Sequence, residues 1–340
     1  MTDADLIALD VGGANLKAAD GLGWTHAEPF PLWREQARLP DALGRILRVA
    51  PWRRVVATMT GEIADCYPSR AAGVAHIVAS LVAAVRDRDA QVAIYLVDGR
   101  LVPPDEAVRQ WAMAAASNWH ALARLAGTHA PAARCLSIDV GSTTTDIVPL
   151  VDAAPAPLAR DDAGRMRTGE LVYTGVVRTP LATLVRVLPH GSVLRPVAAE
   201  RFADSRDAWL LVGELSDDAA DRDTADGAPA TREAARVRLA RTMLVEPADF
   251  SPADAVVAAA RCVDAQARRV AAALRRVAAA SGWEPDGVVL SGHGEALARR
   301  ALALVWPTVP SVSLGGLLGA AVSRVAPAHA LALVGRGMLG

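Results

Sequence analysis

A motif that occurs twice constrains the fold of this chain more than any other feature. Asp-Val-Gly stands at residues 10–12 and again at 139–141, each time after an apolar stretch and before a short polar segment. Gly12 and Gly141 permit tight turns that a side chain would hinder. The backbone N–H groups and polar side chains that follow can form a nest for phosphate oxygens. Two copies about one domain length apart predict an internal duplication with one phosphate-binding loop per half. Two ordinary β-hairpins with turn glycines are the alternative.

The length and composition of the chain fit a protein of two domains. Its 340 residues suffice for two cores, and 52% of them are hydrophobic. The net charge of −1 argues against general nucleic-acid binding. Cys66, Cys135 and Cys262 lie far apart without metal-ligand spacing, which favours a reduced setting. There is no basic, then apolar, N-terminal segment and no apolar run of membrane-spanning length. We therefore expect a soluble cytoplasmic protein without a nucleic-acid or membrane partner.

The order of the predicted elements repeats between the two halves. From residue 5 the chain reads strand, strand, strand, helix, strand, helix, strand, helix. The pattern restarts at residue 134, after Ala130 and Pro131. This predicts an α/β fold with a first domain at 1–130, which the C-terminal segment 325–340 could complete, and a second domain at 131–324.

Three elements are predicted from weaker patterns. Residues 105–125 follow two prolines and are expected to form one continuous helix. The third strand of the second half is expected near 157–159 or 165–167, and a further apolar run predicts a strand at 209–212. These assignments depend on short windows, in which helix and strand patterns are hard to separate.

Carboxylates stand at the ends of predicted strands, where the site residues of open α/β sheets collect. Asp139 and Asp146 cannot bind phosphate directly because like charges repel, but they can hold a divalent cation through water or orient a nucleophile. Glu62 and Asp65 follow the strand predicted at 54–59. Acids that stabilise a helix dipole are the alternative interpretation of these two residues.

Further ligand-binding candidates lie in the two loops and in two later segments. Arg178 offers a planar fork for phosphate, with a solvated arginine beside a helix start as the alternative. A glycine-rich turn before the helix expected at 296–305 can bring N–H groups to an anion, and His293 is otherwise only a turn residue. The phosphate-binding candidates are Gly12, Gly13, Asn15, Gly141, Ser142, Thr143, Thr144 and Thr145. The other substrate-binding candidates are Tyr173, Thr174, Arg178, Gly292, His293 and Gly294.

Several segments together resemble the hydantoinase/oxoprolinase-related proteins of tetrahydromethanopterin-linked one-carbon metabolism, in the acetate and sugar kinase/Hsp70/actin superfamily. The segments are DVGGAN at 10–15, MTGEIADC at 59–66, ASNW at 116–119, DVGSTTTDI at 139–147, GELVYTG at 169–175, RTP at 178–180 and TADG at 224–227. This resemblance covers most of the chain and implies two ribonuclease-H-like domains that face a central cleft. Archaeal members are similar to the enzyme that forms the aryl ether of methanofuran. The chain resembles a bacterial, methylotroph-type member that would serve methylofuran assembly.

The resemblance implies a transferase. It would join 5-(aminomethyl)furan-3-methanol diphosphate to the phenol of tyramine, tyrosine or a glutamyl derivative and release diphosphate. The implied cofactor is Mg²⁺, and ATP is not required, because a metal and N–H donors can neutralise the leaving group.

The roles that the resemblance implies fall on the residues already singled out. The loops at 10–15 and 139–146 would grip the diphosphate from both sides. Asp10 and Asp139 would hold Mg²⁺ through water, and Lys17 would add positive charge. Glu62 or Asp65 would take the phenol proton as general base. Ligand placement would fall to Tyr173 and Arg178.

Other functions stay open at this point. An ATP-dependent small-molecule kinase would use the turn at 292–294 as the floor of a nucleotide pocket. ATP-driven ring opening, as in hydantoinases and oxoprolinases, is a second alternative, and a nucleotide-sensing scaffold without catalysis is a third. The Ala/Leu-rich helix expected at 252–280 could present an apolar face to another copy, so the sequence allows a homo-oligomer.

Overall fold

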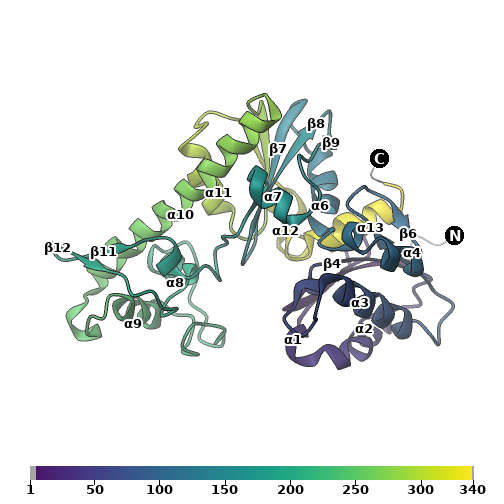
Figure 1. Ribbon diagram of the computed structural model, residues 1–340, viewed down its shortest axis with the longest axis horizontal. Coiled ribbons are helices and arrows are strands. Elements are labelled where there is room, and N and C mark those ends of the chain that lie inside the picture. The colour runs from purple at the N-terminus through teal and green to yellow at the C-terminus, as the bar shows by residue number, and fades with distance from the viewer. Residues whose placement is uncertain (1–4, 339–340) are drawn as a thin grey trace.

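The computed structural model describes residues 5–338, and Figure 1 shows two larger sheets joined by helices. The strands of the first sheet are β1 (Leu6–Val11), β2 (Asn15–Ala19), β3 (Thr25–Pro29), β4 (Arg54–Met59), β5 (Gln91–Tyr95) and β6 (Leu101–Val102). Their order is β3-β2-β1-β4-β5-β6. Strands β1, β2 and β3 pair antiparallel, whereas β4 joins β1 in parallel and β5 joins β4 in parallel.

The second sheet repeats this pattern. Its strands are β7 (Arg134–Val140), β8 (Thr145–Val151), β9 (Ala154–Pro155), β10 (Leu171–Val172), β13 (Gly287–Ser291) and β14 (Ser311–Ser313). Their order is β10-β8-β7-β13-β14, and β9 also pairs with β8. Strands β7, β8 and β10 pair antiparallel, while β13 joins β7 in parallel and β14 joins β13 in parallel.

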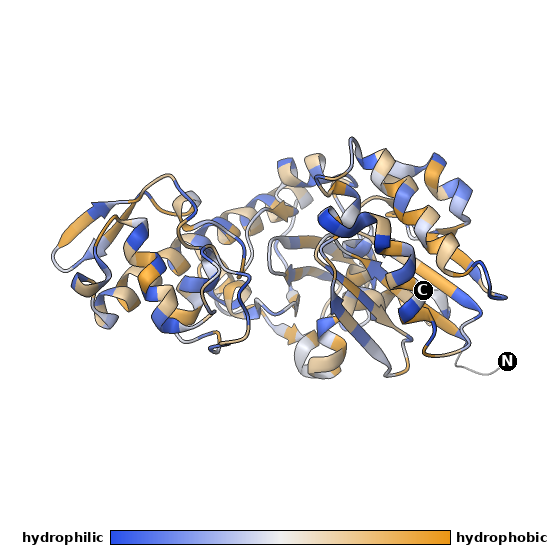
Figure 2. Cartoon of the chain, turned by 90° about the horizontal axis from the view of Figure 1, so that it is seen from below, coloured by the Kyte–Doolittle hydropathy of each residue, from blue (hydrophilic) through white to orange (hydrophobic). Residues whose placement is uncertain are grey.

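Each half therefore has three antiparallel strands followed by two parallel ones, which is the arrangement of a ribonuclease-H-like domain. The central strands β1 and β7 carry mostly buried residues, and Figure 2 shows apolar and hydrophilic colours mixed along the strands. The predicted α/β fold with two ribonuclease-H-like halves is confirmed.

Helices of the first half cover the outer face of its sheet. They are α1 (Leu32–Glu35), α2 (Leu39–Leu47), α3 (Arg70–Ala84), α4 (Pro104–Arg109) and α5 (Trp111–Ala114), with the 3₁₀ turns η1 (Gln36–Arg38) and η2 (Gly61–Ile63). The last helix of this half, α6 (Asn118–Gly127), lies elsewhere. Leu43 of α2 and Ile77 of α3 share one core with Leu9 of β1. Burial of such side chains stabilises this layer by roughly 1.5–3 kcal/mol each.

Helices α6, α12 (Leu314–Arg324) and α13 (Ala326–Gly335) lie between the two sheets. The C-terminal helix α13 packs against β1 and β4, and α6 packs against the second sheet and α13. The predicted domain limit at 130–131 thus follows α6, although α6 lies on the second sheet. Within residues 5–338, no single helix has the length and apolar composition of a membrane span; α12 and α13 reach both only as a pair bent by 94°.

An extension inserted between β10 and β13 forms the far end of the molecule in Figure 1. It contains η3 (Leu181–Thr183), β11 (Val187–His190), β12 (Val193–Pro196), α8 (Ser205–Leu211), α9 (Arg232–Thr242) and η4 (Pro247–Asp249). The long helix α10 (Pro252–Ser281) connects it to the second sheet, where α11 (Glu295–Ala303) follows β13. At 1.5 Å per residue the 30 residues of α10 extend over about 45 Å.

Two strand predictions are wrong. Residues 209–212 largely belong to helix α8, which Asp204 and Asp207 start by a capping box. Its apolar run is buried because it packs against α10, so burial, not strand pairing, explains the run. Residues 165–167 lie in helix α7 (Asp162–Thr168), and the third strand of the second half is β10 instead.

The expected continuous helix at 105–125 is divided into α4, α5 and α6. Ala116, just before α6, has a φ of +49°, which is unusual for a residue with a side chain. The hydroxyl of Ser117 bonds to the Thr58 hydroxyl at 2.7 Å and donates to the carbonyl of Tyr95 at 2.9 Å. These buried hydrogen bonds stabilise the break between the helices and place the start of α6 at the carboxyl ends of β4 and β5.

Candidate active site

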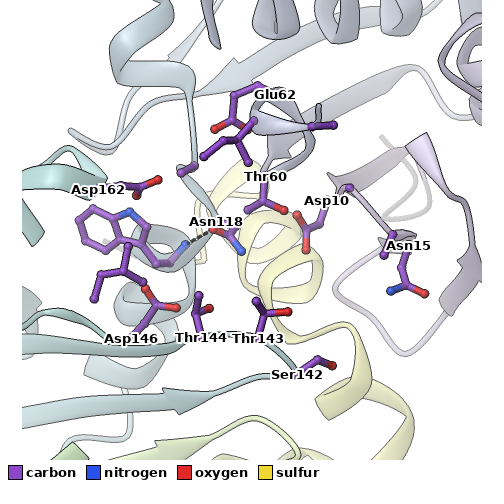
Figure 3. A pocket seen from close by; sticks show the side chains of 18 of the residues that line it. Asp10, Asn15, Thr60, Glu62, Asn118, Ser142, Thr143, Thr144, Asp146 and Asp162 are labelled. Atoms are coloured by element: carbon purple, nitrogen blue, oxygen red, sulfur yellow. Dashed lines mark hydrogen bonds between the residues drawn. The ribbon is translucent and has the colours of Figure 1, made fainter. Parts of the chain in front are cut away.

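A cleft of about 550 Å³ lies between the two halves, and Figure 3 shows its lining. It is bounded by the β1–β2 and β7–β8 turns, by η2, and by the N-terminal ends of α6 and α7. The structure brings these sequence candidates into its wall: Asp10, Gly12, Gly13, Asn15, Lys17, Glu62, Asp65, Ser142, Thr143, Thr144, Asp146, Tyr173 and Arg178.

The two predicted phosphate loops have the same local structure. The N–H of Gly12 donates to the carbonyl of Asn15 at 3.0 Å, and the N–H of Gly141 donates to the carbonyl of Thr144 at 2.9 Å. Both bonds close a tight turn between antiparallel strands, so the intervening N–H groups have no strand partner within the turn. Each sheet therefore presents one polar turn to the cleft, as the repeated motif predicts.

Two aspartates and a lysine lie between these turns. Asp10 faces Lys17 across the β1–β2 pair, and Lys17 is the only lysine in the sequence. Burial raises the pKa of both Asp10 and Asp139, while the charge of Lys17 opposes the rise in each case. Asp139 accepts a hydrogen bond from the Ser291 hydroxyl at 2.7 Å. The Oδ1 atom of Asp10 is buried without a hydrogen-bond partner.

A second acidic group is neutralised by an arginine. Asp146 lies 2.9 Å from the guanidinium of Arg165, which is itself fully buried. The guanidinium stacks 3.9 Å from the centre of the Trp119 ring, a favourable cation–π geometry. Burial raises the pKa of Asp146 to about 6, against the opposing charge of Arg165. The Nε groups of Arg165 and Trp119 are buried without partners.

At another edge of the cleft, Glu62 is buried with 1% of its surface exposed, and neither of its carboxylate oxygens has a hydrogen-bond partner. Arg70, at the start of α3, lies 3.8 Å from it but contacts Asp162 of α7 directly. Burial raises the pKa of Glu62 to about 7; the nearby backbone N–H groups of Glu62 and Ala116 and the charge of Arg70 oppose this rise, and the charge of Asp162 adds to it. The other predicted acid, Asp65, lies exposed in the same turn.

Thr145 and Thr174, two residues predicted to bind ligand, do not line the cleft. Their side chains form buried hydrogen bonds within the protein. The hydroxyl of Thr145 donates to the carbonyl of Thr174 at 2.8 Å, and both residues are fully buried. The hydroxyl of Thr174 bonds to Thr179 at 3.1 Å and accepts from Gln266 of α10 at 2.9 Å. These bonds tie the β8 strand to α10, so the two side chains support the loop from behind.

The turn at 292–294 also lies behind the second loop. A Cβ atom on Gly292 would stand 2.2 Å from the carbonyl oxygen of Val140, and one on Gly294 would stand 2.3 Å from the Val140 side chain. Both glycines are therefore required by close packing against the end of β7. His293 lies 3.3 Å from the Ser142 hydroxyl. None of the three lines the cleft, and neither do Gly141 and Asp139.

The structure adds residues that the sequence candidates did not include. Thr60, Arg70, Asn118, Asp162 and Arg165 line the cleft, and Figure 3 shows Asn118 near its centre. The sequence allows Asn118 and His120 to face the cleft but favours a packed, Ala-rich helix end; the helix break before Ser117 places Asn118 in the cleft. Its neighbour His120 is buried and bonds to the Tyr95 hydroxyl at 2.8 Å.

Comparison with known proteins shows a family and two related synthases. The hydantoinase/oxoprolinase family model matches residues 53–303. A synthase from Methanocaldococcus jannaschii, named for (4-{4-[2-(gamma-L-glutamylamino)ethyl]phenoxymethyl}furan-2-yl)methanamine, is 30% identical over 71% of this chain and 72% of its own length. A synthase of the same name from Methanococcus vannielii is 34% identical over 32% of this chain and 49% of its own length.

The solved structures that resemble this protein share little sequence identity with it. A ROK family glucokinase from Streptomyces griseus, in complex with glucose and AMPPNP, has 13% identity and a TM-score of 0.45 over 98% of this chain and 99% of its own. The activator of 2-hydroxyisocaproyl-CoA dehydratase from Clostridium difficile, with bound ADPNP, has 11% identity and a TM-score of 0.44 over 98% and 96%. The family model, which matches most of the chain, carries the assignment: the chain belongs to the hydantoinase/oxoprolinase family.

Proposed function

We propose that this protein forms the aryl ether of a methanofuran-like cofactor, methylofuran. It would condense 5-(aminomethyl)furan-3-methanol diphosphate with the phenol of tyramine, tyrosine or a glutamyl derivative. The names of the two related synthases support this reaction class. The observation that carries the proposal is a single cleft with two matching polar turns and, apart from them, a buried carboxylate without a hydrogen-bond partner. The polar turns suit the binding of a diphosphate, and the carboxylate suits the removal of a proton from the phenol.

In this proposal the two turns hold the diphosphate. The N–H groups between Gly12 and Asn15, and those between Gly141 and Thr144, offer donors from both halves. The ammonium of Lys17, on β2 between them, would add charge that favours departure of the diphosphate. Ser142, Thr143 and Thr144 add hydroxyl donors in the wall of the cleft.

The site also fits Mg²⁺, which we propose as the cofactor. Among residues 5–338 no group of three or more His, Cys, Asp or Glu side chains is placed to enclose a metal, and Mg²⁺ commonly keeps several waters and binds through one or two carboxylates and substrate phosphates. The unpartnered Oδ1 of Asp10 is the group that such a hydrated ion would satisfy. Asp139, which bonds to Ser291 behind the cleft wall, and Asp146, which pairs with Arg165, would act only through water. Bound Mg²⁺ would neutralise the charge of the leaving diphosphate. ATP has no role in this proposal.

Glu62 is the general base that we propose, in preference to Asp65. Its carboxylate is buried and unpartnered, whereas Asp65 is exposed. A pKa of about 7 suits a group that must accept a proton near neutral pH. Tyr173 and Arg178, in the wall provided by the second half, would place the substrates.

The proposed reaction needs no further reactant, because every bond, proton and electron pair is accounted for. The phenol oxygen forms a bond to the furfuryl carbon, the bond from this carbon to the diphosphate oxygen breaks, and the phenol proton passes to Glu62. The electron pair of the broken bond leaves with the diphosphate. Donation from the furan oxygen stabilises positive charge on the furfuryl carbon, so the protein has mainly to assist the leaving group.

A turnover assay tests the proposal. The purified protein is incubated with Mg²⁺, the furan diphosphate and tyramine, tyrosine or γ-glutamyltyramine, with and without ATP, and products are identified by mass spectrometry. Ether and diphosphate formed without ATP are the expected products, and the preferred phenol identifies the substrate. ATP-dependent phosphorylation of the furan alcohol, supplied in place of its diphosphate in a parallel incubation, together with no ether from the diphosphate, would contradict the proposal and favour a kinase. A cytoplasmic location and a homo-oligomeric state remain predictions.

A further inference from the structure

Arg70 connects the two halves of the molecule at the edge of the cleft. It begins α3 in the first half, and its guanidinium contacts the carboxylate of Asp162, the first residue of α7 in the second half. The same guanidinium lies 3.8 Å from Glu62, beyond hydrogen-bond distance. Figure 3 shows Glu62 and Asp162 on the same side of the pocket. Arg70 therefore has two carboxylates within reach and is bonded to one of them.

The pairing of Arg70 with Asp162 matters because the carboxylate of Glu62 has no hydrogen bond. A buried carboxylate with no hydrogen bond is costly, and a nearby arginine would normally pair with it. Both oxygens of Glu62 are nevertheless without a partner. The Cα and carbonyl of Glu62 are also held by α3, because Gly73 packs against them so closely that a Cβ would stand 2.2 Å from the carbonyl oxygen. Glu62 cannot easily move away, so the position of Arg70 decides whether it is paired.

We propose that Asp162 is a positioning residue that holds Arg70 away from Glu62 and thereby leaves the Glu62 carboxylate free to accept the phenol proton. This inference rests on the proposed function, because it assigns a purpose to the unpaired carboxylate. Asp162 touches no reacting atom in this account and acts through Arg70. An arginine bound to Glu62 would occupy the oxygens that the phenol needs.

The charges around Glu62 define what the test must separate. Arg70 approaches from α3 and Asp162 from α7. Asp65 lies in the same turn as Glu62, and the Asp146–Arg165 pair lines the same cleft from the second half. At the level of the phosphate turns the cleft wall also contains Asp10 and Lys17. Substitution at Asp162 leaves these groups in place, frees Arg70, and also removes a negative charge that by itself raises the pKa of Glu62.

The first test is a direct titration of Glu62. Full-length protein labelled with ¹³C at the glutamate carboxyl carbons is followed by NMR, and Glu62→Gln identifies the signal. In Asp162→Asn, Arg70 is free to pair with Glu62, and the titration midpoint should fall by roughly one to three pH units. In Arg70→Gln the midpoint should rise. Asp105→Asn removes an exposed carboxylate that pairs with Arg109 on α4, and it should leave the midpoint unchanged.

The second test is the pH profile of ether formation by the same variants. The acid limb of kcat/KM should move to lower pH in Asp162→Asn, with reduced kcat at neutral pH, and Asp162→Glu should restore both in part. Unchanged midpoints and profiles in both Asp162→Asn and Arg70→Gln would overturn the inference while leaving the ether reaction intact. Shifted NMR midpoints in a protein that forms no ether would instead overturn the proposed function. Arg70→Gln keeps the test valid if Asp162→Asn fails to fold.

Discussion

The carboxylate of Glu62 shows at the residue scale how function can oppose stability. Burial raises its pKa from 4.5 to about 7. The folded state thus binds a proton more tightly than the unfolded state does. The associated stability is fully present below pH 4.5 and is lost as the pH rises through 7.

Glu62→Gln should therefore stabilise the protein at pH 8 and abolish activity. A difference of 2.5 pKa units corresponds to at most about 3 kcal/mol. Chemical denaturation of both proteins at pH 5 and pH 8 measures this difference in the free energy of unfolding. The variant should lose the fall in unfolding free energy between these pH values that the parent protein shows. An equal fall in both proteins would contradict the assigned environment of Glu62.

Lys17 offers an unusually clean residue-scale test, because it is the only lysine in the sequence. Lys17→Met should lower kcat/KM by about 10²-fold or more, as removal of one charge-stabilising donor does elsewhere. Lys17→Arg should recover part of this, because it keeps the charge but changes the shape of the donor. Reductive ¹³C-methylation labels this side chain and the N-terminal amine only. The Lys17 signal should shift when diphosphate and Mg²⁺ are added, and an unchanged signal would place the diphosphate elsewhere.

At the scale of elements, the repeated turn was predictable and its supports were not. Asp-Val-Gly predicts both turns because their geometry is local. The division of the expected helix at 105–125 depends on Ser117, whose partners Thr58 and Tyr95 are distant in sequence. That break puts Asn118 into the cleft, a placement that the local sequence allows but does not favour. Helix α8 was assigned to a strand for a similar reason, because its short apolar run is buried by α10.

Gly175 is one of these supports and can be tested. A Cβ atom there would stand 2.5 Å from the Gly141 carbonyl oxygen and from the Thr143 nitrogen. Gly175→Ala should displace the second turn, destabilise the protein by about 1–3 kcal/mol and weaken diphosphate binding measured by calorimetry. Gly316→Ala, where the nearest atom lies at an ordinary 3.5 Å, is the matched control. Undiminished diphosphate affinity in Gly175→Ala would argue against a role of the second turn.

At the scale of the whole molecule, the proposed diphosphate site joins two halves that have separate sheets. A ligand held by both turns should stabilise their arrangement. Diphosphate with Mg²⁺ at about 100 times its dissociation constant would add about 2.7 kcal/mol, which is several degrees in the unfolding midpoint. Differential scanning calorimetry measures this shift, which should be smaller in Lys17→Met. Unfolding that is insensitive to the pair of ligands would contradict a shared site.

The cleavage of one bond distinguishes ether formation from phosphoryl transfer most directly. The furan diphosphate is prepared with ¹⁸O between the furfuryl carbon and the first phosphorus and is incubated with the protein, Mg²⁺ and a phenolic amine. If the furfuryl carbon is attacked, the label leaves with the diphosphate and the ether carries only the oxygen of the phenol. We predict this result. Label retained on the furan product would mean that the phosphorus–oxygen bond had broken, and it would contradict the account of this cleft.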